Sequence, residues 1–300
     1  MEPVTRITFV DGEGIKFFGE GPLRLLRTLE RTGSLRSAAM EMGMAYSKAT
    51  KILKQAEAGL GFALTTRSAG GRDGGGSALT PEGKRWLDTY ERYRDACVAE
   101  NRRLYREYFP RTGCVIMASG MGIRFGGNKL MADFRGEPMI LRAIRATEGL
   151  FDCRVVVTRH EDVAKLCREM GIETVLHDLP GRNDTVRLGL EALGEVSCCL
   201  FCPGDQPLLR RDTVARLLDN WKYNREKILR PAFEENQGAP VLFPHWAIPE
   251  LLALPAGIGG GAVIRKYPGE VMTVPVADPF ELADADTPEI LETLRGLCHD

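Results

Sequence analysis

A glycine-rich segment with two basic residues is the part of the sequence best suited to chemistry. It runs from Ser119 to Lys129 and contains four glycines as well as Arg124. Glycines let the backbone approach a ligand closely and turn its N–H groups toward phosphate, and the two cations suit a triphosphate. The segment lacks the complete G-x-G-x-x-G of dinucleotide-binding proteins, and the P-loop pattern G-x-x-x-x-G-K-[ST] is missing. We therefore expect a different kind of nucleotide site, with contacts from Ala118, Ser119, Gly120, Gly122, Arg124 and Lys129.

Two aspartates are candidate ligands for Mg²⁺. Asp205 lies in Gly-Asp-Gln-Pro after an apolar stretch, and Asp284 lies in Asp-Ala-Asp-Thr-Pro-Glu near the end of the chain. Mg²⁺ in proteins takes one or two carboxylates, with waters and phosphate oxygens completing its shell. Asp205 is alternatively a cap of the helix that follows, and either Asp286 or Thr287 caps the last helix. We favour Mg²⁺ binding by Asp205, with Asp284 as a second ligand.

A third polar segment, around Asp184, opens another expected helix. Its sequence is Gly-Arg-Asn-Asp-Thr, and it follows a short apolar stretch. A polar start of this kind suits contacts to a base and a ribose, which makes Asp184 a candidate nucleotide-binding residue. The alternative is that Asp184 or Thr185 only caps the helix.

Strand-like and helix-like segments alternate from Gly113 onward and would position these residues. Such alternation predicts an α/β fold with a mostly parallel, Rossmann-like sheet covered on both faces by helices. Ligands bind beyond the carboxyl ends of the strands in such sheets, where the glycine-rich segment and Asp205 lie. We assign this domain to residues 111–300. Its expected strands are 114–118, 154–158, 173–176 and 198–201, and its expected helices are 138–149, 162–170, 185–193 and 212–223.

The first part of the chain, residues 1–110, has the pattern of an α+β winged helix-turn-helix domain. A helix with apolar spacing over 21–31 is followed by a short helix with Ser34 as N-cap and Gly43 after its end. The next helix has an apolar stripe and a polar, basic outer face. The second helix of such a motif reads the DNA major groove, so we expect DNA contacts from Tyr46, Ser47, Lys48 and Lys51.

The segment after this motif predicts a wing and a long helix. Residues 62–67 and 77–79 read as strands around a glycine-rich turn, and Thr80-Pro81-Glu82 begins a helix that runs to about Phe109. An aromatic and apolar stripe runs along this helix from Trp86 to Tyr108 and is interrupted at Asn101. We interpret it as a linker helix that pairs with its copy in a homodimer. The alternative is that it packs against the second domain.

Composition and charge restrict the class of protein. Residues 1–110 carry 18 basic and 14 acidic side chains, and the rest carry 22 and 27, so a mildly basic part precedes an acidic one. No apolar run approaches the roughly 20 residues of a membrane-spanning helix, and the N-terminus lacks the features of a signal peptide. We expect a cytoplasmic protein without a membrane partner. The pair Cys199 and Cys202 is expected to pack in the core rather than to bind zinc.

The first part of the chain resembles the LysR-like N-terminal domain of ModE-type molybdate regulators. The resemblance rests on GPLRLLRTLERTGSLRSAAMEMGMAYSKATKIL, on the glycine-rich GGRDGGGSALTPEGKRWL and on the long helix after it. It implies a DNA-binding domain and covers about a third of the chain. The molybdate-binding module of those regulators has no counterpart here, so metal sensing is not implied.

The second part resembles the nucleotidyltransferases of molybdenum-cofactor synthesis. The matching motifs are MASGMGIRFGGNKL, GDQPLL, GAPVLF and DADTPE, in this order over residues 113 to 295. The resemblance implies transfer of a nucleoside monophosphate to a molybdopterin phosphate, with Mg²⁺ as cofactor and Arg124, Lys129 and Asp205 as catalytic residues. Ser119 and RNDTVRLGL are closer to the cytidylyl branch than to the guanylyl branch, so CTP is expected rather than GTP.

One departure from that family leaves two functions open. The segment AGIGGG replaces the family's G-D-x-G-G-R, which puts Gly257 and Gly261 where an aspartate and an arginine are expected. The first function is an active transferase. The second is a regulator whose transferase-like domain senses nucleotide or cofactor without turnover.

Overall fold

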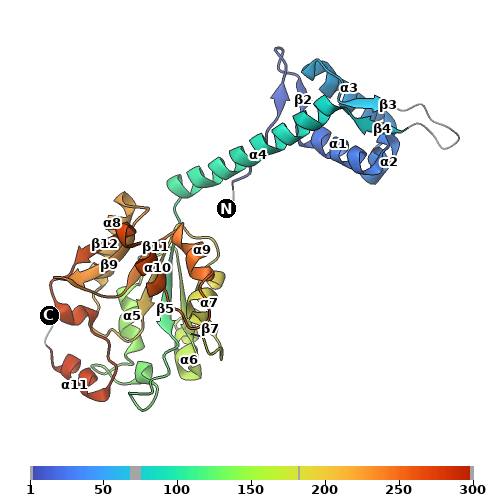
Figure 1. Ribbon diagram of the computed structural model, residues 1–300. Coiled ribbons are helices and arrows are strands. Elements are labelled where there is room, and N and C mark those ends of the chain that lie inside the picture. Colours follow the sequence, from blue (N-terminus) through green and yellow to red (C-terminus); the bar gives the residue numbers. More distant parts are fainter. Residues whose placement is uncertain (1–2, 68–75, 182, 298–300) are drawn as a thin grey trace. The chain divides into compact units, whose positions relative to one another are not determined.

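The computed structural model describes residues 3–67, 76–181 and 183–297 and divides into two compact units, 1–108 and 109–300 (Figure 1). Each unit has its own apolar core. In the part of the chain that the structure describes, no helix is long and apolar enough to cross a membrane.

The N-terminal unit contains the expected helix-turn-helix. Its helices are α1 (Glu20–Thr32), α2 (Leu35–Glu41), α3 (Tyr46–Leu60) and α4 (Pro81–Tyr108). Ser34 is the N-cap of α2, with its side chain accepting a bond from the N–H of Ser37 at 3.4 Å. Gly43 follows the C-cap of α2 with φ of +64°, a left-handed conformation that glycine adopts without steric cost. The tight turn between α2 and α3 therefore follows directly from the sequence.

The core of this unit draws buried side chains from all four of these helices. Leu23, Leu26 and Leu29 of α1 and Ala49 and Leu53 of α3 belong to the same buried cluster. The small side chains of α3 let it pack closely, while its outer face stays polar. The apolar spacing of both helices in the sequence is confirmed.

Strand pairs accompany these helices. β3 (Thr65–Arg67) pairs antiparallel with β4 (Ser77–Leu79), as expected for the wing hairpin. Most of the glycine-rich turn between them, Gly70 to Gly76, lies outside the described residues. A second hairpin, β1 (Phe9–Val10) with β2 (Lys16–Phe18), was absent from the sequence prediction. Its strands are too short to show a recognisable alternation.

The long helix α4 begins as the sequence predicts. Thr80 caps it by accepting a bond from the N–H of Gly83 at 2.8 Å, and Pro81 occupies the first helical position. Trp86 packs its ring 5.5 Å from the rings of both Phe9 and Phe18. The stripe thus serves the unit's own core at its start, whereas Tyr93 and the apolar residues after it in this stripe have exposed surface.

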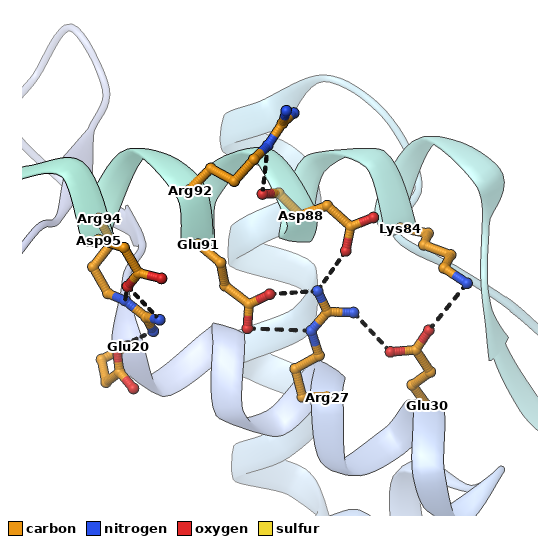
Figure 2. A network of polar contacts seen from close by, with 9 residues as sticks. All are labelled: Glu20, Arg27, Glu30, Lys84, Asp88, Glu91, Arg92, Arg94 and Asp95. Carbon is orange, nitrogen blue, oxygen red and sulfur yellow. Dashed lines mark hydrogen bonds and ion pairs between the residues drawn. The ribbon is translucent and has the colours of Figure 1, made fainter. Parts of the chain in front are cut away.

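A network of ion pairs joins α1 to α4 (Figure 2). The guanidinium of Arg27 contacts Glu30 at 2.8 Å, Asp88 at 2.6 Å and Glu91 at 2.5 Å. Hydrogen bonding to Glu91, more than the other contacts, raises the pKa of Arg27 above its ordinary value. Because Asp88 and Glu91 lie on α4, Arg27 makes the shortest ion pairs between the long helix and α1, and two longer pairs of the network add to them.

We expect Arg27→Gln to loosen this attachment. Losing a bidentate pair and two further contacts costs about 1 kcal/mol at a partly exposed site, which corresponds to roughly fivefold faster amide exchange by local opening. Hydrogen exchange of the first four turns of α4 in the full chain is the measurement. Arg85→Gln is the control, since Arg85 pairs with Glu82 of its own helix. Equal exchange in wild type and Arg27→Gln would contradict the role of the network.

The C-terminal unit is built on one mixed sheet with strand order β10-β9-β11-β8-β5-β6-β7, and β12 pairs with β9. Strands β5, β6, β7 and β8 are mutually parallel, as the sequence predicts. The fold is therefore of the α/β class, with a mostly parallel central sheet. The strands are β5 (Thr112–Ala118), β6 (Cys153–Thr158), β7 (Glu173–Leu176), β8 (Cys198–Pro203), β9 (Ile228–Phe233), β10 (Asn236–Gln237), β11 (Val241–Pro244) and β12 (Val271–Pro275).

Helices cover both faces of this sheet. One core cluster holds side chains of α5, α6, α8 and α11, and the other holds side chains of α7, α9 and α10. The helices are α5 (Ile140–Ala146), α6 (Glu161–Glu169), α7 (Asp184–Leu193), α8 (Arg211–Tyr223), α9 (Ala247–Leu252), α10 (Gly261–Lys266) and α11 (Pro288–Gly296). This three-layer arrangement places the strand ends β5 and β8 side by side at the centre of the unit.

The cysteines of β8 are core residues, as expected. Cys199 and Cys202 are fully buried, and they belong to the clusters on opposite faces of the sheet. Successive strand residues point to opposite faces, so two positions three apart cannot share a metal ion. Burial raises the pKa of the Cys202 thiol to about 12, which keeps it protonated and unreactive.

Candidate functional site

A cavity of about 590 Å³ opens at the carboxyl ends of β5 and β8. Its position is the one expected for ligands of a mostly parallel sheet. Five of the residues expected from the sequence to contact nucleotide lie on its walls together with Asp205. The lining residues are Met117, Ser119, Gly120, Met121, Gly122, Ile123, Arg124, Lys129, Arg159, Pro180, Gly181, Thr185, Pro203, Asp205 and Asp286.

The glycine-rich loop leaves β5 and folds back on itself. Gly122 has φ of +59°, and its carbonyl accepts bonds from Phe125 at 2.9 Å and from Gly126 at 3.0 Å. A Cβ atom at Gly122 would collide with the carbonyl oxygen of Gly127. Gly122 therefore combines a left-handed backbone with a close approach that only glycine allows.

Two side chains from the neighbouring strand's end hold this loop. The ring Nε2 of His160 lies 2.8 Å from the carbonyl oxygen of Gly120, and the amide of Asn128 donates to Asp162 at 2.8 Å. His160 is the N-cap residue of α6, and Asp162 is in its first turn. The two ends of the loop are thus fixed to the start of one helix, which leaves the segment between them free to shape the cavity.

We expect Gly122→Ala to lower nucleotide affinity at least about tenfold. The added methyl group forces both a strained backbone and a shift of the loop, each of which costs about 1 kcal/mol or more. Titration calorimetry with CTP measures the change. Gly127→Ala is the matched control, because a Cβ there meets no atom within 4 Å and needs no left-handed backbone. Equal affinity of the two variants would show that the loop shape does not govern binding.

Lys129 joins the loop to the carboxylates of the site. Its side chain is only 9% exposed, and its Nζ lies 2.5 Å from Oδ2 of Asp205 and 2.9 Å from Oδ1 of Asp286. Burial alone would lower the pKa of Lys129, but the charges and hydrogen bonds of Asp205 and Asp286 outweigh it and raise the pKa. Lys129 is therefore held as a cation between two anions.

Asp205 lies where the sequence places it, after β8 and beside β5. The N–H of Gly204 bonds to the carbonyl of Met117 at 3.0 Å, which ties the two strand ends together. The backbone carbonyl of Asp205 accepts a bond from Ala285 at 2.8 Å, so the Asp-Ala-Asp segment runs alongside. The structure thus brings the glycine loop, Asp205 and the segment before α11 to one place.

Asp284 lies near Asp205, but its carboxylate does not contact Arg124 or Lys129 as that of Asp286 does. Its Oδ1 accepts a bond from Gln206 at 3.0 Å. Desolvation by the surrounding protein, and then the charge of Asp205, raise the pKa of Asp284, although the residue as a whole is exposed and is not among those that line the cavity. Two carboxylates in such proximity repel each other, which a bound cation would relieve.

The role of Asp286 was missed in the sequence, where only helix capping was considered for it. The cap of α11 is Thr287, which accepts a bond from the N–H of Ile290 at 3.3 Å. Asp286 instead contacts Arg124 at 2.8 Å and Lys129 at 2.9 Å. Hydrogen bonding to Lys129 lowers its pKa below the ordinary aspartate value.

Ser119 faces a histidine that the sequence analysis did not single out. Its Oγ lies 2.9 Å from Nε2 of His177 and 3.1 Å from the carbonyl of Val157. Burial, and then the charge of Arg159, lower the pKa of His177, which favours the neutral ring. His177 follows β7, so no spacing in the sequence links it to Ser119.

Two expected nucleotide contacts are not among the lining residues. Ala118 is buried in the core, with its carbonyl accepting a bond from Thr158 at 2.9 Å. The carboxylate of Asp184 accepts a bond from Gly181 at 2.7 Å and contacts Arg187 at 3.4 Å. Gly181 and Thr185, on either side of Asp184, do line the cavity.

The four residues expected to contact DNA share one exposed surface of the N-terminal unit. Tyr46, Ser47, Lys48 and Lys51 are all exposed on α3. The guanidinium of Arg36, on α2, lies 5.2 Å from the ring centre of Tyr46 and adds another cation to this surface. Within the described residues, neither Lys48 nor Lys51 forms an ion pair, so both charges face solvent.

Comparison with known proteins agrees with the two units. A family model for the MobA-like NTP transferase domain matches residues 114–271, which is more than half of the chain. The chain belongs to this family. A second model, for bacterial regulatory helix-turn-helix proteins of the lysR family, matches residues 22–84. This MobA-like chain therefore carries an N-terminal LysR-type helix-turn-helix domain.

Similar curated proteins are related to parts of the chain. The probable molybdenum cofactor guanylyltransferase of Pyrococcus horikoshii is 27% identical over 42% of this chain and 65% of its own length. The 3-deoxy-manno-octulosonate cytidylyltransferase of Neisseria meningitidis is 29% identical over 35% of this chain and 44% of its own. The molybdenum-pterin-binding protein MopB of Rhodobacter capsulatus is 35% identical over 24% and 27%. The chain thus spans between about a quarter and two thirds of the length of these relatives.

Solved structures show the same fold for the MobA-like unit. A nucleotidyl transferase from Methanothermobacter superposes with a TM-score of 0.54 at 19% identity, over 62% of this chain and 96% of that one. A 4-diphosphocytidyl-2C-methyl-D-erythritol synthase from Anaerococcus prevotii gives 0.51 at 15% identity, over 62% and 95%. At this identity the likeness concerns the fold alone.

Proposed function

We propose that the MobA-like unit transfers CMP from CTP to the phosphate of a molybdopterin-type acceptor and releases pyrophosphate. One observation carries this proposal, namely that Lys129 of the glycine loop contacts Asp205 at 2.5 Å on the wall of one cavity. A phosphate-binding loop, a fixed cation and a carboxylate in one place suit phosphoryl transfer, which depends on positioning and charge neutralisation.

Each residue has a definite task in this reaction. An oxygen of the acceptor phosphate attacks the α-phosphorus in line, and the bond to the bridging oxygen breaks so that pyrophosphate leaves with the electron pair. Arg124 and Lys129 neutralise the charge on the triphosphate and on the leaving pyrophosphate. Backbone N–H groups near Gly120 and Gly122 bind its oxygens, while Ser119, which lines the cavity, contacts base and ribose.

The acidic residues fit a Mg²⁺ ion. Asp205 faces the cavity, and Asp284 lies close enough that the charge of Asp205 contributes to its raised pKa. Mg²⁺ typically binds one or two carboxylates of a protein, and phosphate oxygens complete its coordination shell. Asp205 and Asp284 supply two carboxylates. Bound there, Mg²⁺ would neutralise charge on the phosphate oxygens.

The choice of CTP rests on motifs and relatives rather than on a contact. Ser119 stands where the guanylyl branch has glycine, and several relatives are named as cytidylyltransferases. A thermal-shift panel of CTP, GTP, ATP and UTP tests the choice. We expect CTP to raise the melting temperature of the protein more than the other nucleotides do. A larger increase with GTP would identify GTP as the nucleotide substrate instead.

Pyrophosphate release tests the transferase itself. The full chain is incubated with CTP, Mg²⁺ and molybdopterin, and the expected result is stoichiometric release that depends on the acceptor. Nucleotide binding without any release would support the second candidate, a sensor without turnover.

A specific observation favours this second candidate. Gly257 and Gly261 stand where the family has an aspartate and an arginine, and Gly257 has φ of +82° with no atom near the position of a Cβ. Neither glycine offers a charged group to an acceptor. Turnover with molybdopterin therefore distinguishes an enzyme from a sensor, whereas nucleotide binding is expected of both.

For the N-terminal unit we propose DNA binding of the ModE type through α3, as a homodimer. The outer face of α3 is polar and basic, and Tyr93, Leu104 and Tyr108 expose apolar surface along α4. Pairing of α4 with its copy would cover this surface. Sedimentation of the full chain tests the dimer, and a monomer at micromolar concentration would contradict it.

A further inference from the structure

Two of the cations that line the cavity, Arg124 and Lys129, already hold an anion that belongs to the protein. One oxygen of Asp286 lies 2.8 Å from Arg124, and the other lies 2.9 Å from Lys129. A phosphate group presents anionic oxygens to an arginine and a lysine in the same manner. The carboxylate of Asp286 therefore satisfies the same donors that a nucleotide phosphate needs.

The four side chains of this ion-pair network differ in how readily they can change partners. The Lys129 side chain is 9% exposed, and a buried ammonium without a counter-ion is strongly unfavourable. Asp205 holds Lys129 at 2.5 Å and is 22% exposed, whereas Asp286 is 31% exposed and Arg124 is 74% exposed. An incoming phosphate can thus replace Asp286 while Asp205 keeps Lys129 neutralised.

We propose that Asp286 is a built-in counter-ion that occupies the phosphate position of the nucleotide-free site and is displaced by the triphosphate. This inference rests on the proposed function, because it assumes that Arg124 and Lys129 bind phosphate. Asp286 is a positioning residue here. Its carboxylate keeps Arg124 and Lys129 oriented toward the cavity. It also competes with ligands for these two cations, so ligands that carry few charges bind poorly.

The proposal predicts that removing the charge of Asp286 strengthens anion binding. Titration calorimetry measures the affinity of the full chain for inorganic pyrophosphate in EDTA, so that no divalent ion contributes. We expect Asp286→Asn to bind pyrophosphate about three- to tenfold more tightly than wild type, since competition by two ion pairs is lost. A damaged fold would weaken binding, so misfolding cannot produce this result.

Two further variants complete the test. Glu289→Gln removes an exposed charge from the first turn of α11, three residues after Asp286. Among the described residues no ion pair joins Glu289 to either cation, so we expect less than about a twofold gain. Asp286→Glu keeps the charge and should stay near wild type. Unchanged or weaker binding by Asp286→Asn, or an equal gain in Glu289→Gln, would overturn the counter-ion role. Absence of pyrophosphate binding in wild type and all variants would overturn the proposed phosphate site as well.

Discussion

Asp205→Asn is expected to abolish most pyrophosphate release from CTP and molybdopterin, with a loss of at least about a hundredfold in rate. The substitution keeps the size of the side chain but removes the charge that would hold Mg²⁺ and that pairs with Lys129 at 2.5 Å. Loss of a metal-binding carboxylate removes charge neutralisation at the reacting phosphates, the main contribution of the protein to such reactions.

The matched control is Asp212→Asn, which removes an exposed carboxylate at the start of α8. We expect it to release pyrophosphate at the wild-type rate. Nucleotide affinity in EDTA should not fall in Asp205→Asn, because the loop, Arg124 and Lys129 remain. A variant at position 205 that keeps most of its activity would remove Asp205 from the transferase mechanism.

The double substitution Lys48→Ala and Lys51→Ala is expected to weaken DNA binding about ten- to a hundredfold. Both side chains are exposed on α3, and each charge that neutralises a phosphate releases counter-ions from the duplex. The plot of log affinity against log salt should accordingly lose about two units of slope. A gel shift or anisotropy titration of the full chain with a random-sequence duplex, at several salt concentrations, gives both quantities.

Lys84→Ala is the control for this experiment. Lys84 is also exposed in the N-terminal unit, but it lies on α4 near Glu30. We expect nearly unchanged affinity and slope for this variant. Equal losses of DNA affinity in the double variant and in Lys84→Ala would indicate that only the net charge of the unit matters. Unchanged DNA binding by the double variant would exclude α3 as the DNA-reading helix.

Much of the site could be predicted because its residues follow strands. The glycine loop follows β5 and Asp205 follows β8, and parallel neighbours bring such ends together whatever the rest of the fold. The helix-turn-helix was predictable for a similar reason, since the cap Ser34 and the turn residue Gly43 act within a few residues of chain. Local patterns of this kind need no knowledge of distant contacts.

The residues that were missed depend on distant contacts. Asp286 lies 157 positions after Lys129, and the Asp-Ala-Asp sequence does not tell which carboxylate faces the cations and which faces Gln206. His177 reaches Ser119 only through the order of β5, β6 and β7. Strands β9 to β12 were not predicted from the sequence. β10 has only two residues, and Pro231, Pro244 and Pro275 interrupt the residue pattern of the other three strands.

A crystal structure of the chain with CTP and Mn²⁺ in place of Mg²⁺ tests the central claim most directly. We expect an anomalous peak for manganese at the carboxylate of Asp205, with the triphosphate against the loop of residues 119–129 and Asp286 released from Arg124. Nucleotide bound elsewhere, or manganese bound away from Asp205, would contradict the assignment of this cavity as the nucleotidyl-transfer site.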